Sequence, residues 1–136
     1  MIYKTPYETK AYEYATKIVN GDIISSEDVY NCCKRFINDI EKAKNDDYPY
    51  YFDLEQATKI EVLARNLKFP TGLLAGQSID LHISQSFTLS NIYCWRFKDN
   101  PKKKRYRMAV ILKARKNSKF IMVLILVLQV KEIKQV

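Results

Sequence analysis

Hydrophobic residues recur at helical spacing in three stretches of the first 70 residues. The first stretch runs from Tyr7 to Val19 and is followed by Gly21, a residue that commonly ends helices. The second runs from Val29 to Ile40 and the third from Ala57 to Leu67. In each stretch the apolar positions lie three or four residues apart, which is the spacing of one helix face. The pattern therefore predicts three amphipathic helices.

Polar residues in front of the second and third stretches are typical of helix caps. Ser25 is followed three residues later by Asp28, and Asp53 is followed by Gln56 at the same distance. Each pair resembles a capping box, in which the first side chain accepts a hydrogen bond from a free backbone amide of the helix. We expect the second helix to run from this cap to about Lys44.

Glycine and proline mark the connections on either side of the third helix. The polar, proline-containing segment 45–51 is interpreted as a connection that precedes it, and the helix is expected to end near Pro70. Gly72 and Gly76 follow, and glycine disfavours a continuous helix or strand. We interpret the following segment as a loop that leads into a short helix around Gln85 to Trp95.

A different pattern begins after this helix. The basic loop Lys98 to Arg105 is followed by alternating apolar residues from Tyr106 to Leu112, which predict a strand. Residues 115–119 form a polar turn, and the tail from Phe120 to Leu128 is almost purely apolar. An exposed apolar tail is an aggregation hazard, which favours self-association or a covering helix.

These patterns predict an α/β protein, with a mainly helical region over residues 1–97 and a second region over residues 98–136. At 136 residues the chain fits one small domain plus the opening elements of a second. Residues 1–95 carry ten Lys and Arg against thirteen Asp and Glu, whereas residues 96–136 carry thirteen against two. This asymmetry points to an anionic partner for the second region, which is a nucleotide phosphate, a nucleic-acid backbone or an acidic protein surface.

Cysteine spacing and hydropathy argue against several classes of protein. The three cysteines include the neighbours Cys32 and Cys33 and show neither a zinc spacing nor a disulfide framework. His82 stands alone, so we assign it no metal. The first ten residues are polar, unlike a signal peptide, and no apolar run reaches the roughly 18 residues that a membrane span needs. We expect a cytoplasmic protein without membrane contact.

The segment after the predicted strand has the order of a phosphate-binding loop. In such a loop backbone amides wrap the phosphates, a lysine neutralises their oxygens, and the hydroxyl of the next Ser or Thr holds Mg²⁺. Lys119 is placed to supply the charge, but Ser118 stands where glycine is usual and Phe120 where the hydroxyl is needed. Taken alone, a basic turn of this kind is more often a solvated connection.

Six short segments carry a wider resemblance. In chain order they are Ala11, Tyr14, Ile18 and Gly21; Cys33 to Phe36 followed by Tyr51 to Asp53; Leu67, Pro70, Gly72, Ala75, Gly76 and Leu81; Ser84 to Phe87; Cys94 to Arg96; and Arg115 to Phe120. Their order over residues 8–119 resembles the N-terminal part of phage terminase large subunits, the motor proteins of DNA packaging. The chain departs from that family at Ser84 and Cys94, where the family has Trp and Gly. It departs again at Ser118 and Phe120, where the family has Gly and a hydroxyl residue.

The resemblance implies a truncated terminase large subunit that ends in the first strand and a degenerate P-loop, or Walker A loop, of an ATPase domain. Gln85 would contact the adenine edge of ATP, and the loop would hold the phosphates with Mg²⁺. The loop residues are Arg115, Lys116, Asn117, Ser118 and Lys119. By the same resemblance the partners are a small terminase subunit, the portal and double-stranded DNA, in the cytoplasm of a bacterial host. Because Phe120 has no hydroxyl for Mg²⁺, we expect no ATP hydrolysis, and in so short a chain no DNA cleavage.

Two other interpretations stay open. The helical half is also compatible with a small interaction module that docks on a packaging component or on a host protein. The basic run Lys102 to Arg107 alternatively belongs to a nucleic-acid-binding protein unrelated to packaging, whose affinity for duplex DNA falls steeply with salt. We interpret the aromatic cluster Tyr48 to Phe52 as packing rather than as a base-stacking platform.

Overall fold

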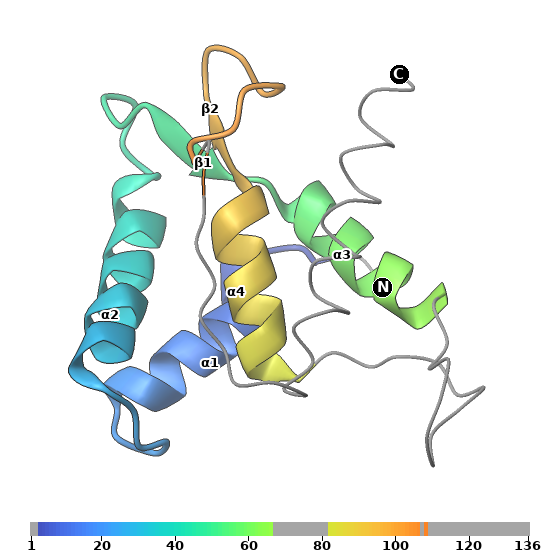
Figure 1. Cartoon of the computed structure of the whole chain (residues 1–136). Coiled ribbons are helices and arrows are strands. Elements are labelled where there is room, and N and C mark those ends of the chain that lie inside the picture. The colour runs from blue at the N-terminus through green and yellow to red at the C-terminus, as the bar shows by residue number, and fades with distance from the viewer. Residues whose placement is uncertain (1–2, 67–81, 107, 109–136) are drawn as a thin grey trace.

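The computed structural model describes residues 3–66, 82–106 and 108 of the chain. Within this part there are four α-helices and one two-stranded antiparallel sheet, so helix and strand are mixed as predicted (Figure 1). The elements in chain order are η1 (Pro6–Glu8), α1 (Lys10–Val19), α2 (Glu27–Lys42), β1 (Tyr50–Phe52), α3 (Leu54–Asn66), α4 (Ile83–Tyr93) and β2 (Trp95–Phe97). Of the strand predicted from Tyr106 to Leu112 only Tyr106 and Met108 are described, and the polar turn and the apolar tail lie outside the described residues.

The first predicted helix is confirmed as α1, but it begins at Lys10, and Tyr7, the first residue of the predicted stretch, lies in the preceding turn η1. Thr9 caps it, because its Oγ1 accepts a hydrogen bond from the backbone amide three residues later at 3.2 Å. Ala11, Ala15 and Ile18 are buried along one face of the helix. Gly21 follows with a φ of +84°, a left-handed conformation that glycine adopts without the strain that a side chain would bring.

The second predicted helix is also present, but its predicted cap is wrong by one residue. The Oγ of Ser26 accepts a hydrogen bond from the Val29 amide at 3.3 Å, whereas the hydroxyl of Ser25 donates to the carbonyl of Ser26. The helix ends at Lys42, two residues before the predicted end, and Ala43 is its C-cap. Two adjacent serines satisfy the same capping pattern, so the sequence alone did not distinguish them.

The cap predicted for the third helix is confirmed in α3. Asp53 Oδ1 accepts hydrogen bonds from the backbone amides of Glu55 at 3.1 Å and Gln56 at 3.4 Å. The short fourth helix, α4, begins at Ile83, two residues before its predicted start. It starts earlier because His82 acts as its N-cap, a residue that capping preferences do not favour.

The sheet was missed by the sequence analysis. Strand β1 pairs with β2 so that Tyr50 lies opposite Phe97 and Phe52 lies opposite Trp95. The connection expected over residues 45–51 thus ends in a strand, and Trp95, expected at the end of a helix, begins β2. Strands of three residues are too short to show periodicity, and their pairing joins segments that are far apart in the chain.

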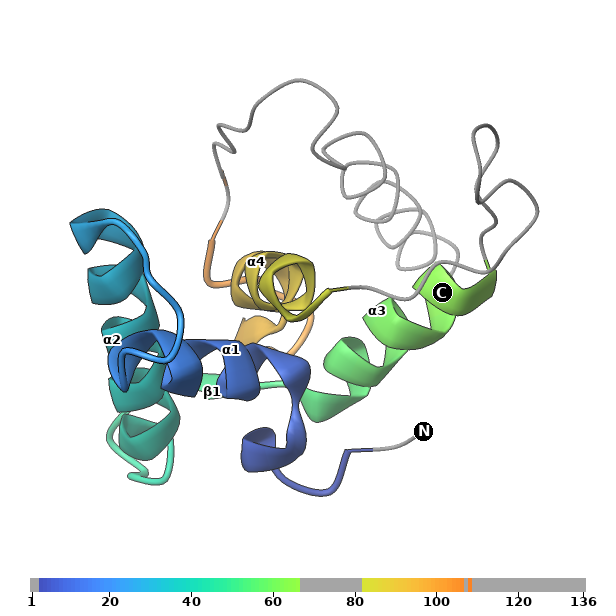
Figure 2. The ribbon, with the colours of Figure 1, turned by 90° about the horizontal axis from the view of Figure 1, so that it is seen from below.

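A cluster of aromatic rings forms the centre of the core. The ring of Phe36 in α2 lies 5.5 Å from that of Phe52, 5.3 Å from that of Phe87 and 5.9 Å from that of Trp95, measured between centroids. The rings meet at steep angles, as in edge-to-face pairs, which are favourable beyond their burial. Helix α1 packs against both α2 and α4 (Figure 2). Because Phe36 contacts both Phe52 in β1 and Trp95 in β2, the two strands are held against α2, and the segment that follows β2 starts from a fixed position.

Candidate functional site: the basic hairpin

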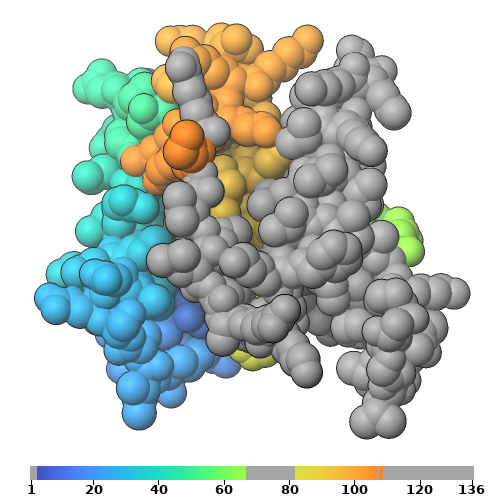
Figure 3. Space-filling view, in the orientation of Figure 1, coloured from blue at the N-terminus to red at the C-terminus, as the bar shows by residue number. Residues whose placement is uncertain are grey.

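The chain turns back after β2 and places a third extended segment beside it. The amide of Phe97 donates to the carbonyl of Lys103 at 3.1 Å, and the amide of Arg105 donates to the carbonyl of Trp95 at 2.9 Å. An antiparallel bridge sets Arg96 opposite Lys104. We call residues 95–106 the basic hairpin, and Figure 3 shows its side chains gathered at one end of the molecule, beside the end of α2.

Lys98 closes the start of the hairpin onto α2. Its Nζ donates hydrogen bonds to the carbonyl oxygens of Ala43 at 3.0 Å and Asn45 at 2.7 Å. These carbonyls lie just beyond the last residue of α2, where the helix dipole places partial negative charge. The Lys98 ammonium is therefore used to complete a helix end.

Arg105 joins the far side of the hairpin to the last turn of α2. Its Nη1 lies 2.9 Å from Oδ2 of Asp39, a residue that is only 5% exposed. The other oxygen of Asp39 accepts a hydrogen bond from the hydroxyl of Tyr48 at 3.0 Å. The guanidinium also lies over the rings of Tyr50 and Trp95, 4.5 and 5.6 Å from their centroids. Burial, together with the hydrogen bond to Asp39, raises the pKa of Tyr48.

Arg96 and Lys104 form a second pair of charged residues in the hairpin, and both are cations. The Cζ of Arg96 lies 4.5 Å from the ring centroid of Tyr93, and the Nζ of Lys104 lies 4.4 Å from the same point. Arg96 is 2% exposed, and its Nε donates to the carbonyl of Tyr93 at 3.0 Å. Burial, and after it the positive charge of Arg96, lowers the pKa of Lys104.

The basic run that the sequence suggested as a DNA grip is therefore divided. Lys102 and Lys103 are exposed, and Lys103 lies 4.7 Å from the ring centroid of Phe97. Lys104 and Arg105 are half-buried and contact other parts of the fold. Arg107 lies outside the described residues. The run does not present a uniform basic surface.

Gln85, expected at the adenine of ATP, lies in the first turn of α4. Its Oε1 accepts a hydrogen bond from the backbone amide of His82 at 3.0 Å, while Nδ1 of His82 accepts one from the amide of Ser84 at 3.2 Å. This reciprocal arrangement is a capping box, in which histidine replaces the usual Ser or Thr. The adenine contact stays a prediction, and the loop residues expected beside it, 115–119, lie outside the described residues.

A buried carboxylate lies on the inner side of α3. Glu61 is 1% exposed, and its Oε1 accepts a hydrogen bond of 2.7 Å from the hydroxyl of Ser86. Its Oε2 forms an ion pair of 3.2 Å with the ammonium of Lys10. Burial, followed by the charge of Glu61, raises the pKa of Tyr3 to about 12. Because Glu61 is paired on both oxygens, it links α3 to α1 and α4 rather than offering a free base.

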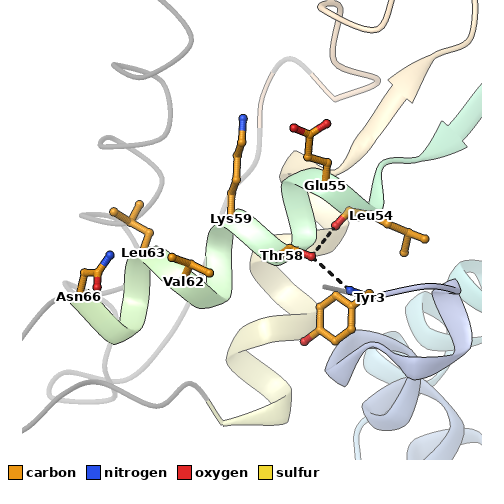
Figure 4. A pocket seen from close by; sticks show the side chains of 8 residues that line it. All are labelled: Tyr3, Leu54, Glu55, Thr58, Lys59, Val62, Leu63 and Asn66. Atoms are coloured by element: carbon orange, nitrogen blue, oxygen red, sulfur yellow. Dashed lines mark hydrogen bonds between the residues drawn. The ribbon is translucent and has the colours of Figure 1, made fainter. Parts of the chain in front are cut away.

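A groove of about 540 Å³ runs along the outer side of α3 (Figure 4). Apolar side chains, among them Leu54, Val62 and Leu63, make up most of its lining together with the ring of Tyr3. Within the described residues no group of three or more His, Cys, Asp or Glu side chains is arranged to hold a metal ion. No helix in that part of the chain is long and apolar enough to span a membrane.

Two residues of this candidate site, Asp39 and Arg96, were not singled out from the sequence. Asp39 was counted only as one acidic residue among thirteen, and Arg96 only as part of a tryptophan–arginine step. Their partners lie in other elements, so no local signal marks them. No family model, curated protein or solved structure matches this chain.

Proposed function

We propose that this chain corresponds to the N-terminal part of a phage terminase large subunit, and that its loop does not support ATP hydrolysis. The proposal rests on the ordered motifs over residues 8–119. One structural observation supports it most directly. Many of the described residues that carry the resemblance are buried or lie at helix ends, although Lys34 and Arg35 are exposed.

The residues that support the proposal lie in or next to helices α1, α3 and α4 and strand β2. Ala11 is fully buried in α1, and Gly21 holds the left-handed conformation that ends this stretch. Asp53 caps α3, and Trp95 is fully buried at the start of β2. Phe87 lies in the aromatic core. Apolar residues are buried in most folds, so Gly21 and Asp53, which act on the backbone, support the proposal more than the buried residues do.

In this proposal the helices serve as a support for the start of an ATPase domain. The ion pair between Asp39 and Arg105 fixes the hairpin immediately before the segment that the resemblance identifies as the first ATPase strand. The degenerate P-loop at residues 115–119 would follow that strand. The partners would be a small terminase subunit, the portal and double-stranded DNA in the bacterial cytoplasm, with ATP and Mg²⁺ as the family's cofactors.

Loss of hydrolysis follows from the chemistry of two loop residues. At Ser118 a side chain stands where the family needs glycine, so the backbone is hindered from wrapping a phosphate. At Phe120 an aromatic ring replaces the hydroxyl that would bind Mg²⁺. Of the glycine, lysine and hydroxyl residue to which the loop chemistry gives separate tasks, Lys119 alone is retained, beside the matching residues Arg115 to Asn117.

The test restores the loop in the full chain. The double variant Ser118→Gly with Phe120→Ser is compared with the natural chain for binding of a fluorescent ATP analogue, with and without Mg²⁺. We expect at least about ten-fold tighter, Mg²⁺-dependent binding, which corresponds to one good charged contact. Adding Lys119→Ala should remove the gain, whereas adding Lys102→Ala should leave it.

The two halves of the proposal fail in different ways. If restoration of the loop residues gives no gain in Mg²⁺-dependent binding, the segment is not a P-loop and the terminase assignment is wrong. If the natural chain already turns over Mg-ATP, and Lys119→Ala abolishes this turnover, the assignment stands but the expected loss of hydrolysis is wrong.

A further inference from the structure

One row of side chains crosses the ribbon on the face away from the aromatic core. Tyr51 in β1 lies opposite Arg96 in β2, and Lys104 lies opposite Arg96 on its other side. Residues directly opposite each other in antiparallel strands point to the same face. Phe52 and Trp95 point to the other face, where they pack on each other with ring centroids 5.4 Å apart. Tyr51, Arg96 and Lys104 therefore form one row.

Arg96 and Lys104 are both positively charged, so they repel each other in this row. Directly opposite like charges destabilise an antiparallel pair, and burial strengthens the effect because little solvent screens them. Arg96 is 2% exposed and Lys104 is half-buried. Among the described residues no carboxylate pairs with either of them, and Nη2 of Arg96 has no hydrogen-bond partner there. A buried guanidinium with an unused donor is costly unless an anion completes it.

The neighbouring arginine shows the contrast. Arg105 occupies the adjacent extended segment and is matched by the buried carboxylate of Asp39. The Asp53 carboxylate, which follows β1, uses its Oδ1 to accept from the backbone amides at the start of α3 and forms no ion pair with Arg96. The ring of Tyr93 offsets part of the charge of both cations through cation–π contacts. The ring carries no net charge, so it does not replace an anion as the partner of Arg96 and Lys104.

We propose that Arg96 and Lys104 form a binding site for a phosphate group. An arginine supplies a planar fork of N–H donors, and a lysine supplies a compact charge that adapts to the ligand, which is a combination that suits phosphate oxygens. Nη2 of Arg96 is buried, so a phosphate that contacts it would have to displace the side chain of Lys104, whose four-carbon stem is flexible. The site does not rest on the proposed terminase function, and none of its residues lies in the P-loop.

The test titrates the full chain with sodium phosphate against sodium chloride at equal ionic strength. Thermal unfolding is followed by the fluorescence of Trp95, which is the sole tryptophan and directly precedes Arg96. We expect a saturable rise in Tm with phosphate beyond that with chloride. Lys104→Gln should weaken the apparent affinity about ten-fold, as loss of one charged hydrogen bond would. Lys102→Gln, which changes an exposed lysine of the same hairpin, should leave the response unchanged.

A second arm distinguishes a free phosphate from the phosphodiester backbone of a nucleic acid. A short DNA duplex replaces phosphate, and binding is measured by anisotropy at two salt concentrations. If Lys104→Gln weakens duplex binding more than Lys102→Gln does, the ligand is a backbone phosphate. If phosphate raises Tm but the two variants bind duplex alike, the ligand is a free phosphate or phosphomonoester. Equal responses of the natural chain to phosphate and chloride would overturn the proposal, as would an undiminished phosphate response in a folded Lys104→Gln variant.

Discussion

The ion pair between Asp39 and Arg105 joins α2 to the basic hairpin, and we expect its removal to destabilise the fold strongly. Asp39→Ala deletes a carboxylate that accepts hydrogen bonds of 2.9 Å from Arg105 and 3.0 Å from Tyr48. Removing one partner of a buried ion pair costs about 3–5 kcal/mol, because the other charge is left uncompensated. The Arg105 side chain is 17% exposed and keeps its contacts with aromatic rings, so we expect a loss of about 3 kcal/mol.

Urea unfolding followed by the fluorescence of Trp95 measures this loss, because the Arg105 guanidinium lies 5.6 Å from the centroid of its indole ring. The matched control is Glu13→Ala, which removes an exposed ion pair of 3.3 Å with Lys17 on α1. Exposed pairs contribute little, so the control should lose less than about 1 kcal/mol. If Asp39→Ala is no more destabilising than Glu13→Ala, the Asp39–Arg105 pair does not hold the hairpin, and the structural reasoning about it fails.

Three further predictions concern other parts of the fold. Burial raises the pKa of Tyr3 from 10.0 to about 12, so the unfolded chain loses this proton at lower pH than the folded chain. The contribution of Tyr3 to the free energy of unfolding should therefore be complete below pH 10 and should fall as the pH rises toward 12. Tyr3→Phe should flatten this fall in alkaline unfolding curves, and an unchanged slope would contradict it. Burial raises the pKa of Cys33 to about 12 and also raises that of Cys94, so an aromatic disulfide reagent should label half-buried Cys32 first. Cys32→Ser should remove the fast phase, and its persistence would contradict this ranking of the thiols. Gly21→Ala has open space for its Cβ but a φ of +84°, so thermal unfolding should show a loss of about 1 kcal/mol, and no loss would mean that the turn relaxes.

Helix starts and stops were predictable where their signals are local. Gly21 and Asp53 act on backbone groups within a few residues, so the end of α1 and the start of α3 follow from the sequence. The cap at His82 did not, because histidine is an unusual N-cap and its role depends on Gln85 folding back onto its amide. Local rules therefore predict the end of α1 and the start of α3, but they miss the start of α4, where His82 caps the helix as Asp53 caps α3.

The ribbon and the ion pair were beyond local rules. Asp39 and Arg105 are separated by 66 positions, and each side chain taken alone has the composition of a solvated surface. Their pairing depends on the core around Phe36, which brings α2 and β2 together. The candidate phosphate site has the same origin, since Arg96 meets Lys104 only after the chain reverses in the hairpin. The sequence shows which residues are charged, but it does not show which of them contact a carboxylate and which contact another cation.

The alternation of strand side chains gives the basic run three different roles. Adjacent residues of an extended segment point to opposite faces, so Arg105 reaches the aromatic face and Asp39, while Lys104 joins Arg96 on the other face. Lys102 lies in the exposed turn. If the run were a uniform grip on DNA, loss of any one of these cations would weaken duplex binding by a similar amount. The ribbon predicts separate outcomes. Arg105→Ala should lower the stability of the fold, Lys104→Gln should lower the response to phosphate, and Lys102→Gln should change neither. Urea unfolding and phosphate titration of the three variants test this directly, and a uniform loss of duplex binding with unchanged stability would favour the simpler electrostatic grip.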